Sequence, residues 1–240
     1  MLTPNRQFSD SKRLGAFCRK VGRESQADRS TAKLYGLRVA LRYEGETLPA
    51  DVARAMIAVL DEEFIRISDQ LGCPAKERLV AIVQSRDAYL KGTNAVEWSG
   101  ALYDGRIHVA LSEGRQFGPA TRHALAHEIV HACLANIGQF PSWLHEGLAQ
   151  KLSGDGLTDT DRQQLRSAIG SGAIPKLENI SQNWSHMNPG HARLAYNLAL
   201  AAADALFENY ATYGIRNLLH NPQMLQQITP GLDRALGITP

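Results

Sequence analysis

The sequence predicts an α+β fold, with a small mixed or antiparallel sheet in the first half and a mostly α-helical second half. Segments in which apolar and polar residues alternate, the period of a half-buried strand, lie between residues 37 and 111. From residue 119 onward, apolar residues recur mainly at intervals of three and four, the period of a helix that packs on one side. Strands that precede a run of helices, instead of alternating with them, are typical of an α+β domain.

The first half is predicted to hold a strand, a long helix, a second strand and a hairpin. Residues 37–43 alternate in polarity, and residues 49–71 carry apolar side chains at helical spacing. Residues 78–83 form a short apolar run, which indicates a strand buried on both faces. Between residues 100 and 111, the dipeptide Asp104-Gly105 is a strong signal for a hairpin turn.

The second half is predicted to be a series of helices separated by breaks rich in glycine and proline. The predicted helices cover residues 119–137, 141–150, 158–169, 192–210 and a last stretch from 213 to the C-terminus. Residues 173–190 are predicted to form a loop, and Pro222 and Pro230 are expected to break the last helical stretch.

The helix predicted over residues 119–137 contains the motif His127-Glu128-Ile129-Val130-His131. Residues four apart share one face of a helix, so the two imidazoles can converge on one metal ion. Glu128 lies about 100° further round the helix, beside the metal position. A carboxylate there can deprotonate a metal-bound water, which is the role of a general base in hydrolysis. The alternative is a helix that carries two solvent-exposed histidines.

A catalytic zinc site needs three protein ligands and one open position. The segment after the motif helix offers Glu146 or its neighbour His145 as the third ligand. Their side chains point about 100° apart on a helix, so only one of them can face the metal. His123, one turn before His127, is either a group near the metal site or simply an exposed histidine.

Together, the segments HEIVH and PSWLHEGLAQ resemble the gluzincin metallopeptidases, and more closely the small peptidase-MA-like hydrolases among them. The resemblance extends from about residue 37 to the C-terminus. It implies a thermolysin-like zincin architecture, in which the sheet packs on the active-site helix. It also implies one catalytic domain over residues 34–240, with the sheet and active-site helix in 34–138 and the helical half in 139–240.

Carried over to this chain, the resemblance makes His127, His131 and Glu146 the ligands of one Zn²⁺ ion. Glu128 becomes the general base of an amide-cleaving peptidase, and Tyr196 a donor to the oxyanion. The strand that ends at residue 111 would be the edge strand that pairs with a peptide or protein substrate. One departure is Gln150, which stands where the thermolysin branch has an acid that supports a zinc histidine. The metzincin pattern fails at residues 134 and 137, which are Leu and Ile.

The alternative is a catalytically weak or inactive module that uses zinc only for stability and binds peptides or proteins. An intact Glu128 argues against it, because a structural zinc site has no use for a base beside the metal. The enzyme and the binding module are expected to differ in their ability to cleave a mixed peptide library.

Charge is concentrated at the N-terminus. Of the 26 basic and 24 acidic residues, eight basic and three acidic ones lie in residues 1–33, which are predicted to form a disordered, solvated tail. Binding of nucleic acid or anionic lipid by this tail is an alternative, but nucleic acid is not an expected partner.

The chain contains no apolar run of the ~18 to 20 residues that a membrane span requires.

The three cysteines, Cys18, Cys73 and Cys133, form an odd set without C-x-x-C spacing. This pattern predicts neither a disulfide framework nor a thiolate zinc site, and Cys133 is interpreted as a small buried apolar residue. No signal-peptide core is found. The expected compartment is therefore cytoplasmic, or exported if the natural start lies upstream. The sequence does not indicate an oligomeric state.

Overall fold

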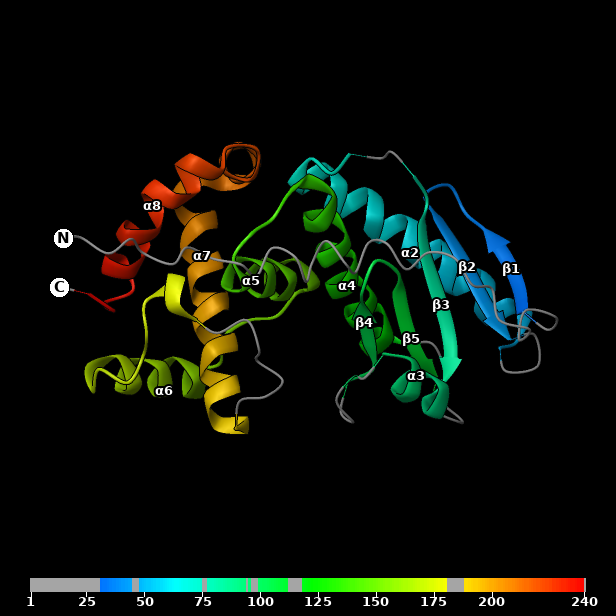
Figure 1. Cartoon of the computed structure of the whole chain (residues 1–240), viewed down its shortest axis with the longest axis horizontal. Coiled ribbons are helices and arrows are strands. Elements are labelled where there is room, and N and C mark those ends of the chain that lie inside the picture. The colour runs from blue at the N-terminus through cyan, green and yellow to red at the C-terminus, as the bar shows by residue number, and fades with distance from the viewer. Residues whose placement is uncertain are drawn as a thin grey trace, which may run out of the picture. The chain divides into compact units, whose positions relative to one another are not determined.

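A five-stranded mixed sheet lies in the first half of the chain, and the second half is helical (Figure 1). The computed structural model describes residues 31–44, 48–74, 77–93, 95, 99–111, 118–180 and 188–239. The predicted tail lies outside the described residues except for its last three. The predicted α+β class, with a small mixed sheet followed by helices, is confirmed.

The strand order in the sheet is β1-β2-β3-β5-β4. Strands β2, β3 and β5 run parallel, and β4 pairs antiparallel with β5. The strands cover Thr31–Tyr35 (β1), Val39–Glu44 (β2), Leu79–Ser85 (β3), Ala101–Tyr103 (β4) and Ile107–Leu111 (β5). Along β3 the residues alternate between buried and half-buried, so one face of this strand is more deeply covered than the other.

The hairpin predicted around Asp104-Gly105 is present as β4 and β5, and Gly105 adopts a φ of 106° in the turn. The prediction that the strand ending at Leu111 is an edge strand is wrong. This strand, β5, pairs on one side with β3 and on the other with β4, so β4 forms the edge. The second strand of the hairpin, β5, pairs with β3, and the first strand, β4, lies on the far side of β5. No local pattern in the sequence specifies this arrangement.

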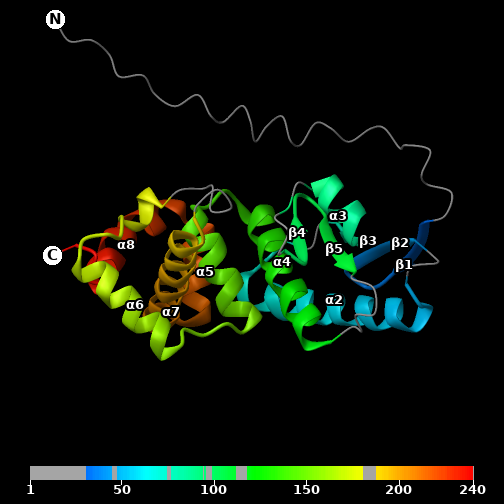
Figure 2. The ribbon, with the colours of Figure 1, turned by 90° about the horizontal axis from the view of Figure 1, so that it is seen from below.

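Two helices accompany the sheet. Helix α2 spans Ala50–Leu71, as predicted, and ends where Gly72 adopts the left-handed conformation. Helix α3, Arg86–Thr93, was not predicted. Figure 2 shows α2 on one side of the sheet and α3 on the other.

The first strand, β1, was also not predicted, and it begins within the last residues of the predicted tail. The predicted strand from residue 37 begins two residues later, at Val39, because Leu37 lies in the turn between β1 and β2 and is 75% exposed.

Helices α4, Pro119–Ile137, and α5, Ser142–Ser153, occupy the positions predicted for the motif segments. Helix α4 packs against α2, α5 and the β4–β5 hairpin, and α5 packs against α7. The core consequently includes both helices: Leu125, Ile129, Trp143 and Leu148 are at most 1% exposed.

The remaining helices are α6, Asp159–Gly170, a short 3₁₀ helix, Leu177–Asn179, α7, Pro189–His220, and α8, Pro222–Ala235. Helix α7 extends beyond the predicted residue 210, but its path is interrupted at Ala211, where φ is 49°. Pro222 begins α8, as its fixed φ favours, and Pro230 lies inside the helix without ending it.

Cys73 and Cys133 form a disulfide bond, so the prediction of a purely apolar role for Cys133 is wrong. The two Cα atoms are 5.4 Å apart, although 60 positions separate the residues in the chain. That long separation left no local signal for the pairing. Cys18 lies outside the described residues. Within the described part of the chain, no helix is both long enough and apolar enough to cross a membrane.

Candidate metal centre

Helix α4 presents His127 and His131 along one partly exposed edge. Their ring centroids are 4.8 Å apart, and the ring planes are inclined at 76°. The residues between and beside them, Ile129, Val130 and Ala132, are fully buried. The apolar side of α4 therefore fixes the helix in the core, while the two imidazoles remain 20% and 17% exposed.

Helix α5 brings Glu146 to these two histidines. Glu146 Oε2 lies 3.5 Å from His127 Nε2, and Oε1 lies 3.8 Å from His131 Nε2. His145 lies to one side, where its ring stacks on that of His131 with centroids 5.7 Å apart. The structure thus brings Glu146, and not His145, into the cluster.

The three side chains form a group that could hold a metal ion. One ligand atom from each of His127, His131 and Glu146 lies within 4.8 Å of the other two. Among the described residues, the buried Glu146 Oε2 makes no hydrogen bond beyond its 3.5 Å ionic contact with His127. A buried carboxylate oxygen without a hydrogen bond is costly, and a cation between the two imidazoles and this oxygen would remove that cost. Two nitrogens and one carboxylate oxygen are a donor set that suits Zn²⁺.

Two of the three groups in the cluster, Glu146 and His131, are in the charge state that a divalent cation requires. Burial would raise the pKa of Glu146, but the neighbouring histidines lower it overall, so the carboxylate is ionised. Burial lowers the pKa of His131 to about 3, which keeps its imidazole neutral. Burial also opposes the charge on His127, but the adjacent carboxylates of Glu146 and Glu128 raise its pKa overall. A metal would displace that proton, because a ligating imidazole must be neutral.

Glu128 lies beside the cluster and is only 8% exposed. Burial raises the pKa of Glu128 to about 7, and the charge of Glu146 adds to this rise. The charge of His127 and a backbone hydrogen bond with Tyr103 of β4 act in the opposite direction. Glu128 can therefore both accept and release a proton near neutral pH, as a general acid and base must do.

Tyr196 on α7 lies close enough to Glu146 and Glu128 for their charges to affect its pKa. Burial raises the pKa of its phenol, and the charges of Glu146 and Glu128 raise it further. The phenol therefore keeps its proton at neutral pH. Gln150 does not take the place of an acid that supports a histidine: its amide donates to the backbone oxygens of Glu146 and Tyr196, at 3.2 and 3.0 Å.

Two groups near the cluster, Asp155 and the backbone of Tyr103, were not indicated by the sequence. His123 Nε2 contacts Asp155 Oδ1 at 2.9 Å, and the charge of Asp155 contributes to the raised pKa of His127. Asp155 lies in the loop after α5, a position that carries no motif. The backbone contact of Tyr103 with Glu128 is independent of side-chain identity, so sequence could not reveal it.

Among known proteins, no protein-family model and no curated protein matches this chain. Its function is therefore inferred from the site.

Proposed function

We propose that the protein is a zinc-dependent hydrolase of the gluzincin type, most simply a peptidase. The convergence of His127, His131 and Glu146 carries this proposal, together with a buried oxygen of Glu146 that makes no hydrogen bond to the described residues beyond its 3.5 Å contact with His127. A structural zinc site would fill all four coordination positions with protein ligands. The described residues supply three, which leaves one position for water or substrate, as in catalytic zinc sites.

A zinc ion held by these residues would supply Lewis acidity and lower the pKa of a coordinated water to about 7. Glu128 would accept the proton of the attacking water, because its carboxylate lies beside the cluster, close enough to His127 and Glu146 for their charges to act on it. It would then deliver that proton to the leaving amine. Tyr196, which keeps its phenolic proton, would donate a hydrogen bond to the oxygen that becomes negative.

The proposed substrate is an extended peptide that would pair with the edge strand β4. Gly100 accepts a hydrogen bond from Ala110 of β5, and Asp104 donates one to Arg106, the residue before β5. The backbone groups of the residues between Gly100 and Asp104 therefore alternate in direction. Tyr103 therefore directs its backbone groups away from β5, and it contacts Glu128. A peptide beside β4 would place its carbonyl near the catalytic base.

Three variants test the metal site and the base separately. Replacing Glu128 with Gln removes the proton acceptor but no metal ligand, so we expect turnover of a mixed peptide library to fall at least about 100-fold with zinc retained. Glu146→Ala removes a ligand, so zinc should be lost together with activity. His191→Ala, an exposed histidine at the start of α7, is the matched control and should change neither.

Zinc is measured by elemental analysis after dialysis, and cleavage by mass spectrometry of the library. Equal zinc in the wild type and Glu146→Ala would refute the ligand assignment. Full activity in Glu128→Gln would refute the mechanism. Zinc retention by a wild type that binds peptides of the library without cleaving any would instead favour the binding module.

A further inference from the structure

The disulfide bond between Cys73 and Cys133 lies close to the metal cluster along the chain. Cys133 is fully buried on α4, two residues after His131. Cys73 follows Gly72, the residue that ends α2. The bond therefore ties the end of α2 to the part of α4 that carries the second imidazole.

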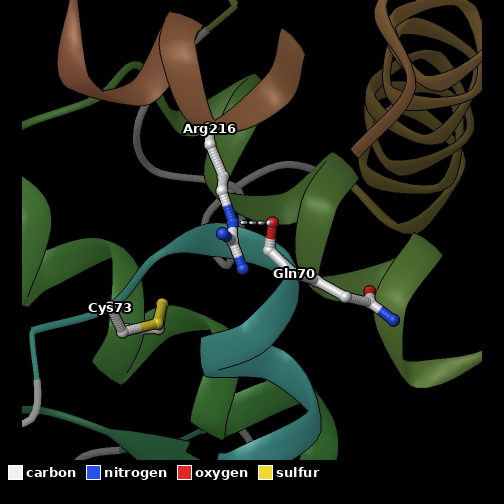
Figure 3. Close-up of a disulfide and its surroundings, with 4 residues drawn as sticks. Gln70, Cys73 and Arg216 are labelled. Carbon is white, nitrogen blue, oxygen red and sulfur yellow. Dashed lines mark hydrogen bonds between the residues drawn. A yellow bond between two sulfur atoms is a disulfide. The ribbon is translucent and has the colours of Figure 1, made fainter. Parts of the chain in front are cut away.

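The α2 side of this bond is held firmly. Gly72 donates its backbone N–H to the carbonyl of Ser68, which closes the last turn of α2. Arg216 of α7 donates from Nε to the carbonyl oxygen of Gln70 at 3.3 Å, beside the disulfide (Figure 3). Cys73 is thus attached to a helix end that α7 also contacts. The disulfide bond therefore restrains the end of α4 relative to both α2 and α7.

A second link joins α2 to the other end of α4. Glu63, which is 4% exposed, contacts Arg122 Nη2 through Oε1 at 2.7 Å. From the first link to the second is ten residues on the α2 side, from Glu63 to Cys73 just beyond the helix end, and eleven on α4, from Arg122 to Cys133, so these helices run in the same direction side by side. His127 and His131 lie between the links, and the disulfide is the one nearer to His131.

We propose that the disulfide positions His131 for metal binding, so that the metal affinity of the site depends on the thiol–disulfide state of the protein. This inference rests on the metal site of the proposed function. Without the bond, the last turns of α4 keep their packing but lose their covalent link to α2. Small displacements of His131 would then weaken a site that requires three ligands at fixed distances.

A dithiol reductant can open the bond in two balanced steps. One thiolate of the reductant attacks the sulfur of Cys73, the less buried of the two residues, and Cys133 leaves as a thiolate that takes up a proton. The second thiolate of the reductant then displaces Cys73, so the protein gains two electrons and two protons while the reductant becomes a disulfide. The protein would therefore hold its metal best in an oxidising compartment, where such bonds persist.

The test measures the dissociation constant for Co²⁺, with the visible absorption of the bound ion as the readout, and for Zn²⁺ by competition. The full-length Cys18→Ser variant keeps the Cys73–Cys133 pair and prevents exchange with a third thiol. It is compared, before reduction and after reduction with dithiothreitol that is then removed by anaerobic desalting, with Cys18→Ser/Cys73→Ala treated in the same way, because the thiols of the reductant bind both metals. Leu165→Ala on α6 is the control for lost stability, because Leu165 is buried but lies on a helix that carries no ligand.

We expect reduction to weaken metal binding at least tenfold in Cys18→Ser and to have no effect on the variant without the bond, which should bind as weakly as the reduced protein. Leu165→Ala should lower the Tm without changing either dissociation constant. Equal metal affinity in the oxidised and reduced forms would overturn the inference. Failure of the oxidised protein to bind either metal would instead refute the metal site itself. Circular dichroism at the assay temperature verifies that each variant is folded, and the reduced form tests the inference even if Cys73→Ala does not fold.

Discussion

Gly147 illustrates at the scale of one residue how the third ligand is placed. It follows Glu146 directly and lies where α5 packs closely against α7. A Cβ atom at this position would lie 2.2 Å from the carbonyl oxygen of Ala199 and 2.9 Å from its carbonyl carbon. Such distances are far inside van der Waals contact, and the atoms they would reach belong to the backbone of a buried helix. Only glycine permits this approach.

Gly147→Ala should therefore destabilise the protein and weaken metal binding. Overpacking of this kind typically costs about 1 to 3 kcal/mol, because α5 or α7 must shift. The same shift would move Glu146 away from the two imidazoles. Urea unfolding and the Zn²⁺ dissociation constant measure the two effects.

Gly170→Ala is the matched control for this substitution. Gly170 ends α6 and its φ is not positive. Apart from its own turn of the helix, no atom of the described residues lies within 4 Å of the position that its Cβ would occupy. Alanine there should leave metal affinity unchanged and alter stability by less than about 1 kcal/mol. If the two variants behave alike, close approach at Gly147 does not position Glu146.

At the scale of elements, the junction of α6 and α7 depends on one carboxylate. Asp161 completes a capping box with Thr158, whose hydroxyl donates to Asp161 Oδ2 at 2.5 Å. From α7, Arg193 Nη2 and Asn197 Nδ2 donate to Asp161 Oδ1 at 2.8 and 3.1 Å. These hydrogen bonds, first that of Thr158 and then that of Arg193, hold the pKa of Asp161 well below its usual range.

This lowered pKa predicts how stability depends on pH. The ionised carboxylate favours the folded state wherever the unfolded chain is also ionised, above about pH 4. The contribution is lost as the pH falls from there toward the lower pKa of the folded state. Asp161→Asn should therefore lower the urea midpoint at pH 7 and lower it less at pH 3.

Asp159→Asn is the control for this pH dependence. Asp159 is exposed in the same first turn of α6, so its replacement removes a comparable charge near the helix N-terminus. Its effect should be small. A difference between wild type and Asp161→Asn that is the same at pH 7 and pH 3 would contradict the assigned role of the carboxylate.

Elements with local signals were predicted well, and elements that depend on distant residues were not. Helix α4 begins at a Gly-Pro pair and ends at a glycine, and the β4–β5 turn has its own Asp-Gly signal. Strand β1 has no such signal, because the turn that follows it is held by a side chain of α2. Asp61 there accepts the backbone N–H groups of residues 37, 38 and 39 at 2.6 to 2.9 Å.

The candidate site follows the same rule. The spacing of His127 and His131 fixes their common face wherever a helix forms, so sequence could pair them. Helix geometry left Glu146 and His145 as alternatives, because the choice depends on how α5 rotates against α4 and α7. The disulfide and the interior position of β5 depend on contacts between segments far apart in the chain. No periodicity in either segment predicts them.

At the scale of the whole described structure, α2 connects the sheet to the helical half. Arg66 donates from Nη2 to the carbonyl oxygen of Leu152 on α5 at 2.7 Å, and its guanidinium also contacts Glu63 at 2.6 Å. Through Glu63, α2 is also linked to Arg122 of α4. The buried carboxylate of Glu63 thus connects α4, through Arg122, with α5, through Arg66. These are the two helices that carry the metal cluster.

Removing this carboxylate should destabilise the protein as one cooperative unit. Glu63→Ala leaves Arg66 and Arg122 without their shared acceptor, and hydrogen bonds to charged groups contribute about 1.5 to 3 kcal/mol each. The arginine side chains are 38% and 42% exposed, so water can replace part of the lost interaction. We therefore expect a loss of about 2 to 3 kcal/mol, below the 3 to 5 kcal/mol typical of fully buried pairs.

The neighbouring Glu62 provides the matched control. It contacts the same nitrogen of Arg122 at 2.9 Å, but its side chain is 61% exposed. Exposed pairs contribute at most about 1 kcal/mol because solvent screens them, so Glu62→Ala should have little effect. Urea unfolding followed by circular dichroism and by tryptophan fluorescence measures both variants. Equal losses would mean that burial of Glu63 is unimportant, whereas separate transitions by the two probes would mean that α2 does not couple the two halves.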